Sequence, residues 1–353
     1  MDQQLQSFRE RILAASAARS PLRIRGNGTK DWYGQRLEGD ILDTSAYSGI
    51  VSYDPTELVL TARAGTPLRE IGQALSEKNQ MLAFEPPRFD GLATIGGIVA
   101  SGLSGPRRQA VGSVRDFVLG SVLMDGKGDV LHFGGQVMKN VAGYDVSRLL
   151  AGSLGTLGLI LEVSVKVLPR PVAQQTLQFE MSEQAAIKQL NVWGGQPLPL
   201  SASCWHQGKL MVRLSGARAA VDAAVQKMGG ERMNEADAFW DSLREQNHAF
   251  FNDVSKGLWR LSVPTVAESL QLPGEQLIEW GGAQRWLKSP ADAAEIRAVA
   301  EQAGGHATLY RGGDKSVGVF HPLAPAVARI HHTLKNTFDP AGIFNRGRMY
   351  PDF

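Results

Sequence analysis

Three glycine-rich segments, spread over the first 160 residues, constrain what this chain can fold into. They read RGNGTK at 25–30, GLATIGGIVASGLSGPRR at 91–108 and AGYDVSRLLAGSLGTLGL at 142–159. Glycine permits positive φ and close approach of the backbone, so the amides of such segments can converge on an anion. Arg25 and Lys30 add positive charge to the first segment. Each segment alone is explained equally well as a turn, but three together predict a site for a phosphate-containing ligand.

The common nucleotide-binding motifs are missing from these segments. The sequence has no G-x-x-x-x-G-K-[ST], which argues against a P-loop nucleotidase, and no G-x-G-x-x-G opens a helix within a βαβ unit. The stretch GSLGTLG at 152–158 has the spacing G-x-x-G-x-x-G, and it leads into a strand pattern instead of a helix. A nicotinamide site is therefore a poor second choice.

The spacing of apolar residues predicts an α+β protein in two parts. In the first part, a helix over 3–17 precedes short strands, a second helix after Pro67, a glycine-rich loop region at 86–116, and strands that end near Pro171. In the second part, helices alternate with strand-like segments, which favours an antiparallel sheet. The helices predicted there cover 183–192, 217–228, 236–247, 291–303 and 324–337.

Length and aromatic content set the expected domain division. A chain of 353 residues is too long for one ordinary core and suits two domains. Six of the seven tryptophans lie within 176–336, so the second half has an aromatic core of its own. We expect one domain over 1–170, another over 171–336, and a C-terminal segment, 337–353, that packs against the rest.

Charge and cysteine content exclude several classes of protein. The formal net charge is only +2, so no overall field points to nucleic acid or to an acidic membrane surface. The single cysteine, Cys204, rules out an internal disulfide, a cysteine-ligated iron–sulfur cluster and a four-cysteine zinc site on this chain alone. Neither a signal peptide nor an apolar run of about 18 residues occurs, so we expect a soluble, cytoplasmic protein.

The order of the motifs is similar to that of a known family. RGNGTK, TIGGIVASG, GSVRDFVLG, MKNVAGYDVSRLLAGSLGTLG and DPAGIFNRGRM follow one another along the chain. Together they resemble the FAD-linked oxidases of the vanillyl-alcohol oxidase type, which have a PCMH-type FAD-binding domain. The resemblance covers nearly the whole chain. It implies that 1–170 is the FAD-binding domain, that 171–336 is a cap, and that 337–353 returns to the flavin.

The resemblance also assigns the glycine-rich segments to FAD. The first would wrap the pyrophosphate, the second would lie along the pyrophosphate and the isoalloxazine ring, and the third would contact the flavin and the adenine side. The residues implied are Arg25, Gly26, Asn27, Gly28, Thr29 and Lys30, then Thr94, Ile95, Gly96, Gly97, Ala100, Ser101 and Gly102, then Gly152, Ser153, Gly155, Thr156, Gly158 and Ile160, and finally Asn345.

The sequence departs from its relatives in the second half. Related flavin dehydrogenases of 2-hydroxy acids carry H-x-G-D-G-N-x-H there, which supplies a metal ligand and substrate contacts. The comparable stretch here reads GGHATLYRGGDKSVGVFHP at 304–322, so no metal site is expected. His331 and His332 point about 100° apart on a helix and make poor joint ligands. The first two glycine-rich segments lack His and Cys, so we expect FAD to be bound non-covalently.

Further segments, such as FEPPRFD and LPGEQLIEWGGAQRWLKS, resemble the FAD-binding subunits of glycolate oxidases. This implies oxidation of glycolate to glyoxylate, within a complex that contains a homologous FAD subunit and an iron–sulfur subunit. Through that complex the chain would lie at the inner face of the cytoplasmic membrane. Two alternatives stay open. The chain is a non-catalytic or electron-transfer flavin subunit, or it is an independent 2-hydroxy-acid oxidase.

Candidates for substrate contacts are few. Arg107 and Arg108 adjoin the second segment, and a planar guanidinium binds a carboxylate in a bidentate way. A surface pair near the phosphates, or a partner interface, explains them equally well. Lys139 and Tyr144 are candidates for the flavin edge, and both are equally well explained as structural residues.

Overall fold

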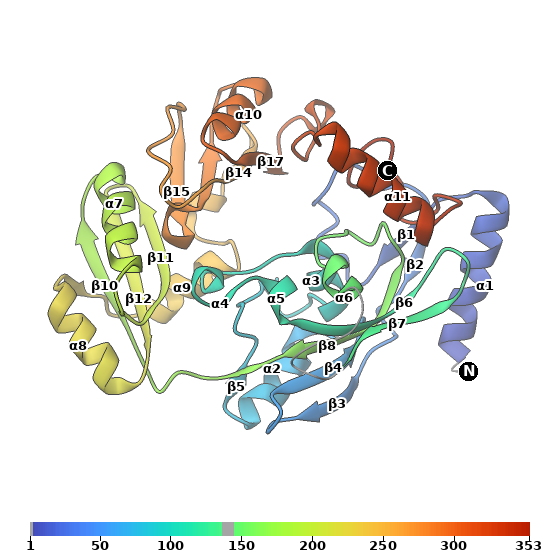
Figure 1. Cartoon of the computed structure of the whole chain (residues 1–353), viewed down its shortest axis with the longest axis horizontal. Helices are drawn as coiled ribbons and strands as arrows, with labels where there is room; N and C mark the ends of the chain where they lie inside the picture. Colours follow the sequence, from blue (N-terminus) through green and yellow to red (C-terminus); the bar gives the residue numbers. More distant parts are fainter. Residues whose placement is uncertain (1–2, 136–144) are drawn as a thin grey trace.

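The computed structural model describes residues 3–135 and 145–353. It is an α+β structure, as predicted, with one large sheet in each of its two parts and two small two-stranded sheets (Figure 1). The helices of the first part are α1 (Gln3–Ala18), α2 (Leu68–Glu77), α3 (Ile95–Ser101), α4 (Arg108–Val111), α5 (Val114–Phe117) and α6 (Val146–Leu149). Its strands are β1 (Leu22–Arg25), β2 (Asp40–Asp43), β3 (Ile50–Asp54), β4 (Val59–Arg63), β5 (Gln80–Met81), β6 (Val118–Met124), β7 (Val130–Gly134), β8 (Leu159–Lys166) and β9 (Leu168–Pro169).

The sheet of the first part has the strand order β3-β4-β8-β6-β7, and every pair in it is antiparallel. Apolar residues from α2, α3 and α5 pack against it in one core cluster. A second cluster joins α1 to the small parallel sheet of β1 and β2 and to the C-terminal segment. The glycine-rich residues 25–30 therefore leave β1 at a place where helix, sheet and C-terminus meet.

The prediction of a loop over 86–116 is wrong in part, because α3, α4 and most of α5 lie within it. Two glycines in α3 hide its apolar periodicity. A Cβ on Gly96 would lie 2.5 Å from the Cβ of Ala64, so α3 approaches this neighbouring backbone more closely than a residue with a side chain would permit.

The second part is built on an eight-stranded antiparallel sheet with the order β13-β10-β12-β11-β15-β16-β14-β17. Its strands are β10 (Ala173–Glu180), β11 (Leu200–His206), β12 (Lys209–Gly216), β13 (Glu231–Arg232), β14 (Leu258–Ser262), β15 (Glu275–Glu279), β16 (Gln284–Lys288) and β17 (His306–Arg311). Its helices are α7 (Glu183–Gly194), α8 (Arg218–Met228), α9 (Ala236–Arg244) and α10 (Ala293–Gln302). The next helix along the chain, α11 (Pro325–Phe338), packs on the first part through Leu334 and Phe338. These five helices confirm the predicted ones.

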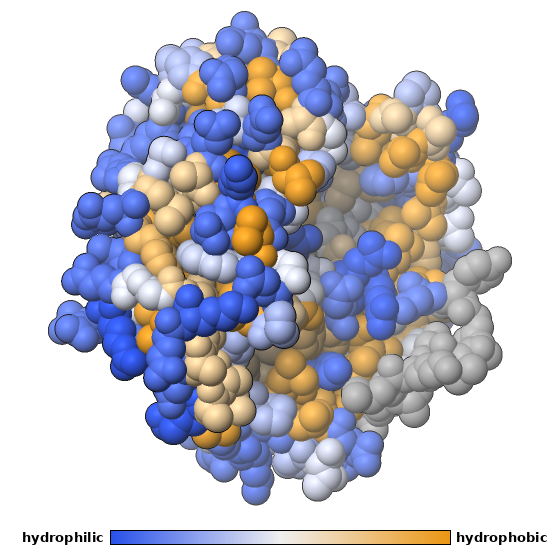
Figure 2. Space-filling view, turned by 60° about the vertical axis from the view of Figure 1, so that its left-hand side comes forward, coloured by the Kyte–Doolittle hydropathy of each residue, from blue (hydrophilic) through white to orange (hydrophobic). Residues whose placement is uncertain are grey.

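The two faces of this sheet have different roles. Helices α7, α8 and α10 contribute to core clusters that involve one face. The other face carries an aromatic cluster that includes Tyr33 and Leu154 of the first part, so the cap sheet packs directly on the first part. With the cap turned forward, hydrophilic residues cover most of the visible surface, and apolar residues lie between them (Figure 2).

The C-terminal segment returns to the first part. Phe344 forms a parallel bridge with Leu22 of β1, where Leu22 N donates to Ile343 O at 2.7 Å and Asn345 N donates to Leu22 O at 2.9 Å. The buried Asp339 accepts from the backbone of Ile343 and Phe344, which fixes the turn after α11. Among the described residues, no helix combines the length and the apolar character needed to cross a membrane.

Candidate functional site

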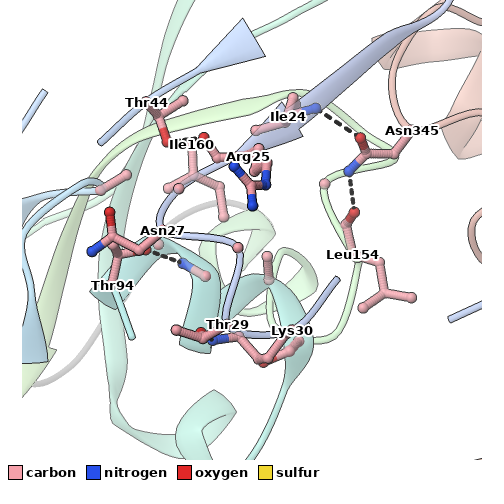
Figure 3. A pocket seen from close by; sticks show the side chains of 18 of the residues that line it. Ile24, Arg25, Asn27, Thr29, Lys30, Thr44, Thr94, Leu154, Ile160 and Asn345 are labelled. Atoms are coloured by element: carbon pink, nitrogen blue, oxygen red, sulfur yellow. Dashed lines mark hydrogen bonds between the residues drawn. The ribbon is translucent and has the colours of Figure 1, made fainter. Parts of the chain in front are cut away.

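A pocket lies where the three glycine-rich segments meet the C-terminal segment (Figure 3). It has about 740 Å³ of space outside atoms, part of which is open to solvent. Its walls are formed by Ile24, Arg25, Gly26, Asn27, Gly28, Thr29, Lys30, Asp31, Tyr33, Thr44, Ala64, Thr94, Gly96, Gly97, Ala100, Ser101, Leu154, Gly155, Gly158, Leu159, Ile160, Asn345 and Arg348.

The first wall is the turn that follows β1. Gly28 has φ +71°, a left-handed conformation that side chains other than glycine rarely adopt. The Gly28 carbonyl accepts from Asp31 N at 3.1 Å, and the carboxylate of Asp31 accepts from Arg25 Nε at 2.8 Å. This turn therefore bends back on itself and presents its backbone to the pocket.

The second wall is the first turn of α3. Thr94 is its N-cap, and the Thr94 side chain accepts from Gly97 N at 3.2 Å. Gly26 of the first wall lies against this cap, because a Cβ on Gly26 would be 2.8 Å from Thr94 Oγ1. The two walls thus touch where Gly26, which has no side chain, meets the side chain of Thr94.

The third wall is held in place by Asn345. Its Oδ1 accepts from Ile24 N at 2.8 Å, and its Nδ2 donates to Leu154 O at 2.6 Å (Figure 3). One buried side chain therefore connects β1, the third glycine-rich segment and the C-terminal segment. Asn345 itself has φ +41°, a conformation that asparagine tolerates better than most residues.

Positive charge is concentrated at this pocket. Arg23, Arg25, Lys30 and Arg348 are close to a single carboxylate, Asp31, which pairs with Arg23 and Arg25. Burial and the charge of Arg348 lower the pKa of Lys30 to about 8, although Asp31 acts in the opposite direction. Burial lowers the pKa of Arg348 to about 10. An anion in the pocket would offset this repulsion.

Most of the residues expected at the site line this pocket. They are Arg25, Gly26, Asn27, Gly28, Thr29, Lys30, Thr94, Gly96, Gly97, Ala100, Ser101, Gly155, Gly158, Ile160 and Asn345.

Five expected residues, Ile95, Gly102, Gly152, Ser153 and Thr156, are not part of these walls. Ile95 points into the core and is fully buried there. Gly102 ends α3 in a left-handed conformation. The hydroxyl of Ser153 donates to Leu150 O and that of Thr156 donates to Ser153 O, so both shape the turn instead of the cavity.

Sequence reasoning missed eight wall residues: Ile24, Asp31, Tyr33, Thr44, Ala64, Leu154, Leu159 and Arg348. Arg348 follows Asn345 in the stretch NRGR, so its position beside a motif residue could have indicated it. Thr44 and Ala64 lie at or next to strand ends without any motif, and only the fold brings them to the site.

The two arginine candidates are not part of these walls. Arg107 Nε donates to Glu85 at 3.1 Å, and the same carboxylate accepts from Arg213 of β12 at 2.8 Å. Burial would raise the pKa of Glu85, but Arg213 and Arg107 bring it below its usual value. The Arg108 guanidinium lies 4.2 Å from the ring centre of Trp280. Lys139 and Tyr144 lie outside the described residues.

Within the described residues, His, Cys, Asp and Glu side chains form no group of three or more that could hold a metal ion. His331 and His332 face Tyr350 and Phe353 of the C-terminal segment. His332 also pairs with Asp352 at 3.2 Å.

The features of the pocket fit a dinucleotide cofactor with a pyrophosphate. Lys30 and Arg348 are each 8% exposed, and within the described chain neither forms a salt bridge with a carboxylate. Arg348 Nε lacks an acceptor altogether among these residues. Gly26 and Gly28 pack closely against the side chains of Thr94 and Arg25, so neither position admits a side chain of its own. Buried cations without a counter-ion, beside bare backbone, are the donors that a phosphate group requires.

Comparisons with known proteins agree with this geometry. Residues 4–134 match the model of a family described as an FAD binding domain, so FAD is the cofactor. The chain is 50% identical over 347 residues to glycolate oxidase subunit GlcE of Escherichia coli (strain K12), covering 98% of this chain and 97% of that protein. It is also 31% identical to glycolate oxidase subunit GlcD of Bacillus subtilis (strain 168), over 57% of this chain and 44% of that protein.

Among solved structures, alkyldihydroxyacetonephosphate synthase superposes with a TM-score of 0.65 at 15% identity, covering 96% of this chain and 74% of that chain. This likeness supports the fold, a two-domain PCMH-type FAD-binding architecture with an antiparallel-sheet cap. The identity to the Escherichia coli protein extends over both parts of the chain. The chain therefore belongs to the glycolate oxidase subunit GlcE family of FAD-linked oxidoreductases.

Proposed function

We propose that this chain is the FAD-binding subunit of a glycolate oxidase complex, which oxidises glycolate to glyoxylate. The observation that carries the proposal is the match to the Escherichia coli subunit over nearly the full length of both proteins. Residues 1–170 would be the FAD-binding domain, 171–336 the cap, and 337–353 the segment that completes the pocket. Bound FAD would accept the two electrons that leave glycolate.

The walls of the pocket are the proposed FAD contacts. The backbone of 25–30 would hold the pyrophosphate beside Lys30, and the first turn of α3, whose own amides bond within the protein, would lie along it. Residues 154–160 and Asn345 would position the rest of the cofactor. Ile95, Gly102, Gly152, Ser153 and Thr156 would support these walls through their turns and core contacts.

We expect the cofactor to be bound non-covalently, since none of the residues found in the pocket walls is His or Cys. The purified protein should be yellow, with one FAD per chain. Acid or heat should release the flavin into the supernatant. Flavin that stays with the precipitated chain would contradict the non-covalent state, and colourless protein that takes up no added FAD would contradict the site.

The proposal includes partners, because electrons on FAD need an exit. Cys204 is the only cysteine and is buried, so the chain cannot ligate an iron–sulfur cluster by itself. A homologous FAD subunit and an iron–sulfur subunit would accept the electrons at the inner face of the cytoplasmic membrane. We expect co-purification with both, and glycolate-dependent dye reduction that requires all three. An equal rate with this chain alone would reject the need for partners and support an independent 2-hydroxy-acid oxidase.

A specific observation favours the second candidate function, an electron-transfer flavin subunit whose chemistry occurs in the homologous subunit. Tyr33 of the pocket wall packs on Tyr310 at 5.2 Å between ring centres, and Tyr310 packs on Trp286 at 4.8 Å. These buried rings fill the cap face that meets the pocket. Stopped-flow mixing of the FAD-loaded chain with glycolate, and separately with D-lactate, decides between the two. If the absorbance of oxidised flavin is lost at a catalytic rate, this chain has a substrate site. If the absorbance does not change, the result favours the electron-transfer subunit.

A further inference from the structure

A second cavity lies between the first part and the cap, and we call it the junction cavity. It has about 1350 Å³ of space outside atoms, part of which is open to solvent. Helix α2, β5, residues 85–88 and Arg107 form one side of it, and residues of β10, β12 and α9 form the other. Among the described residues, none lines both this cavity and the pocket of the glycine-rich segments. The junction cavity is therefore a separate candidate site.

Positive charge predominates in the walls of the junction cavity. Five arginines line it, namely Arg88, Arg107, Arg170, Arg213 and Arg244. Two of them, Arg88 and Arg244, pair with Glu245 at 3.1 and 2.8 Å, and both also approach Asp241. A further carboxylate of the wall, Asp237, accepts from the amide of Gln174 at 3.0 Å. In the described part of the chain, the other three arginines have only Glu85 as an ion-pair partner.

Arg107 is a buried cation with incomplete pairing. Its side chain is 8% exposed, and burial lowers its pKa against the opposing effect of Glu85. Arg107 Nε donates to Glu85 at 3.1 Å, but the same carboxylate also accepts from Arg213 Nη2 at 2.8 and 2.9 Å. Arg107 Nη2 reaches only the neutral Gln174 and Ser215, at 3.4 and 3.5 Å, which is long for a hydrogen bond. One negative charge thus faces two buried guanidinium groups.

Arg170 adds a second cation to the same cavity. It follows β9, where the chain passes from the first part to the cap. Its Nε donates to the carbonyl of Gln80 at 3.3 Å, and no carboxylate of the described residues pairs with it. A planar guanidinium can hold a carboxylate through two parallel hydrogen bonds. Arg107 and Arg170 therefore offer two places for carboxylate groups within one cavity.

We propose that the junction cavity binds a small dicarboxylate, with one carboxylate at Arg107 and the other at Arg170. The ligand would lie between the two parts of the chain, because Arg107 belongs to the first part and its neighbours Gln174 and Ser215 belong to the cap. It would supply the negative charge that Glu85 alone does not, and would stabilise the packing of the cap on the first part. The proposal depends neither on FAD nor on glycolate.

The test is calorimetric titration of the purified full chain with succinate, at constant ionic strength. Acetate, inorganic phosphate and chloride are titrated for comparison. Succinate should bind at one site per chain, more tightly than the other three anions, and should raise the melting temperature in a saturable way. Arg107→Gln and Arg170→Gln should each weaken succinate binding about tenfold or more, the usual effect of losing a charge-assisted pair.

Arg36→Gln is the matched control, because it removes the same charge from a side chain that is more than half exposed and pairs with Glu38 outside the cavity. Its affinity for succinate should equal that of the unaltered chain. Arg107→Gln leaves Glu85 with one partner, Arg213, so the fold should persist, and the melting temperature without ligand checks this. If that variant does not fold, Arg170→Gln decides, since Arg170 lies outside the Glu85 pairs.

Three results would overturn the proposal. The first is the absence of saturable succinate binding up to about 10 mM, a concentration that detects even very weak affinity. The second is unchanged succinate affinity in a folded Arg107→Gln or Arg170→Gln variant. The third is acetate or phosphate binding as tightly as succinate, which would contradict a site for two carboxylates.

Discussion

Replacing Gly28 with valine is expected to give a folded protein that no longer retains FAD. Gly28 has φ +71°, and a Cβ there would lie 2.2 Å from Arg25 Nη2. A β-branched residue in this conformation costs about 1–3 kcal/mol. The turn would relieve that strain by moving its amides away from the pocket. With the lost contacts added, FAD affinity should fall at least about 100-fold, or about 3 kcal/mol, as measured by titration of apo-protein.

Gly208→Val is the matched control for this substitution. Gly208 has φ +80° in the turn between β11 and β12, far from the pocket walls in sequence, and a Cβ there would meet no atom within 4 Å. The Gly208→Val substitution should lower the melting temperature through the same kind of backbone strain and leave FAD affinity unchanged. Normal affinity in Gly28→Val, or equal loss in both variants, would show that residues 25–30 form only a turn.

The second large effect is expected at Glu85. Its carboxylate accepts from Arg107 Nε at 3.1 Å and from Arg213 Nη2 at 2.8 Å, and thereby connects the first part to β12 of the cap. Glu85→Ala would leave two buried guanidinium groups without their counter-ion. Loss of one partner from a buried ion pair typically costs about 3–5 kcal/mol, so the free energy of unfolding in urea should fall by that amount at neutral pH.

Acid should diminish this effect. The arginines hold the pKa of Glu85 below its usual value, so its contribution is complete above the unfolded-state pKa and is lost as the pH falls through the folded-state pKa. The difference between the unaltered chain and Glu85→Ala should therefore shrink below about pH 4. Glu38→Ala, which removes the partly exposed partner of the exposed Arg36, should cost at most about 1 kcal/mol. A loss below 1 kcal/mol in Glu85→Ala would refute the structural role.

The parts of the site that depend on glycine could be predicted from the sequence. Gly28 and Gly155 have positive φ, and Gly26 and Gly96 allow close backbone approach, so their identity reports their local geometry. The predicted helices of the cap were recognisable for a similar reason, since apolar spacing is a local property. Helix α3 of the first part was not recognisable in this way, because its glycines conceal the apolar period.

Contacts between distant segments could not be predicted in the same way. Arg107 and Arg348 are both arginines near motif residues. Arg107 nevertheless pairs with Glu85, whereas Arg348 lines the pocket. Nothing in the sequence distinguishes these two arginines, because the residues that each of them contacts lie in distant segments of the chain. Thr44 and Ala64 are part of the pocket for the same reason.

The central claim is that FAD on this chain takes part in glycolate oxidation by the complex. It is tested most directly by assembling the complex with the Gly28→Val chain and measuring glycolate-dependent dye reduction, after gel filtration has shown that all subunits are present. The account predicts that activity falls to a few per cent of that of the unaltered complex, while the Gly208→Val complex keeps full activity. Full activity in a complex whose Gly28→Val chain holds no flavin would contradict this claim. The chain would then have only a structural role in the complex.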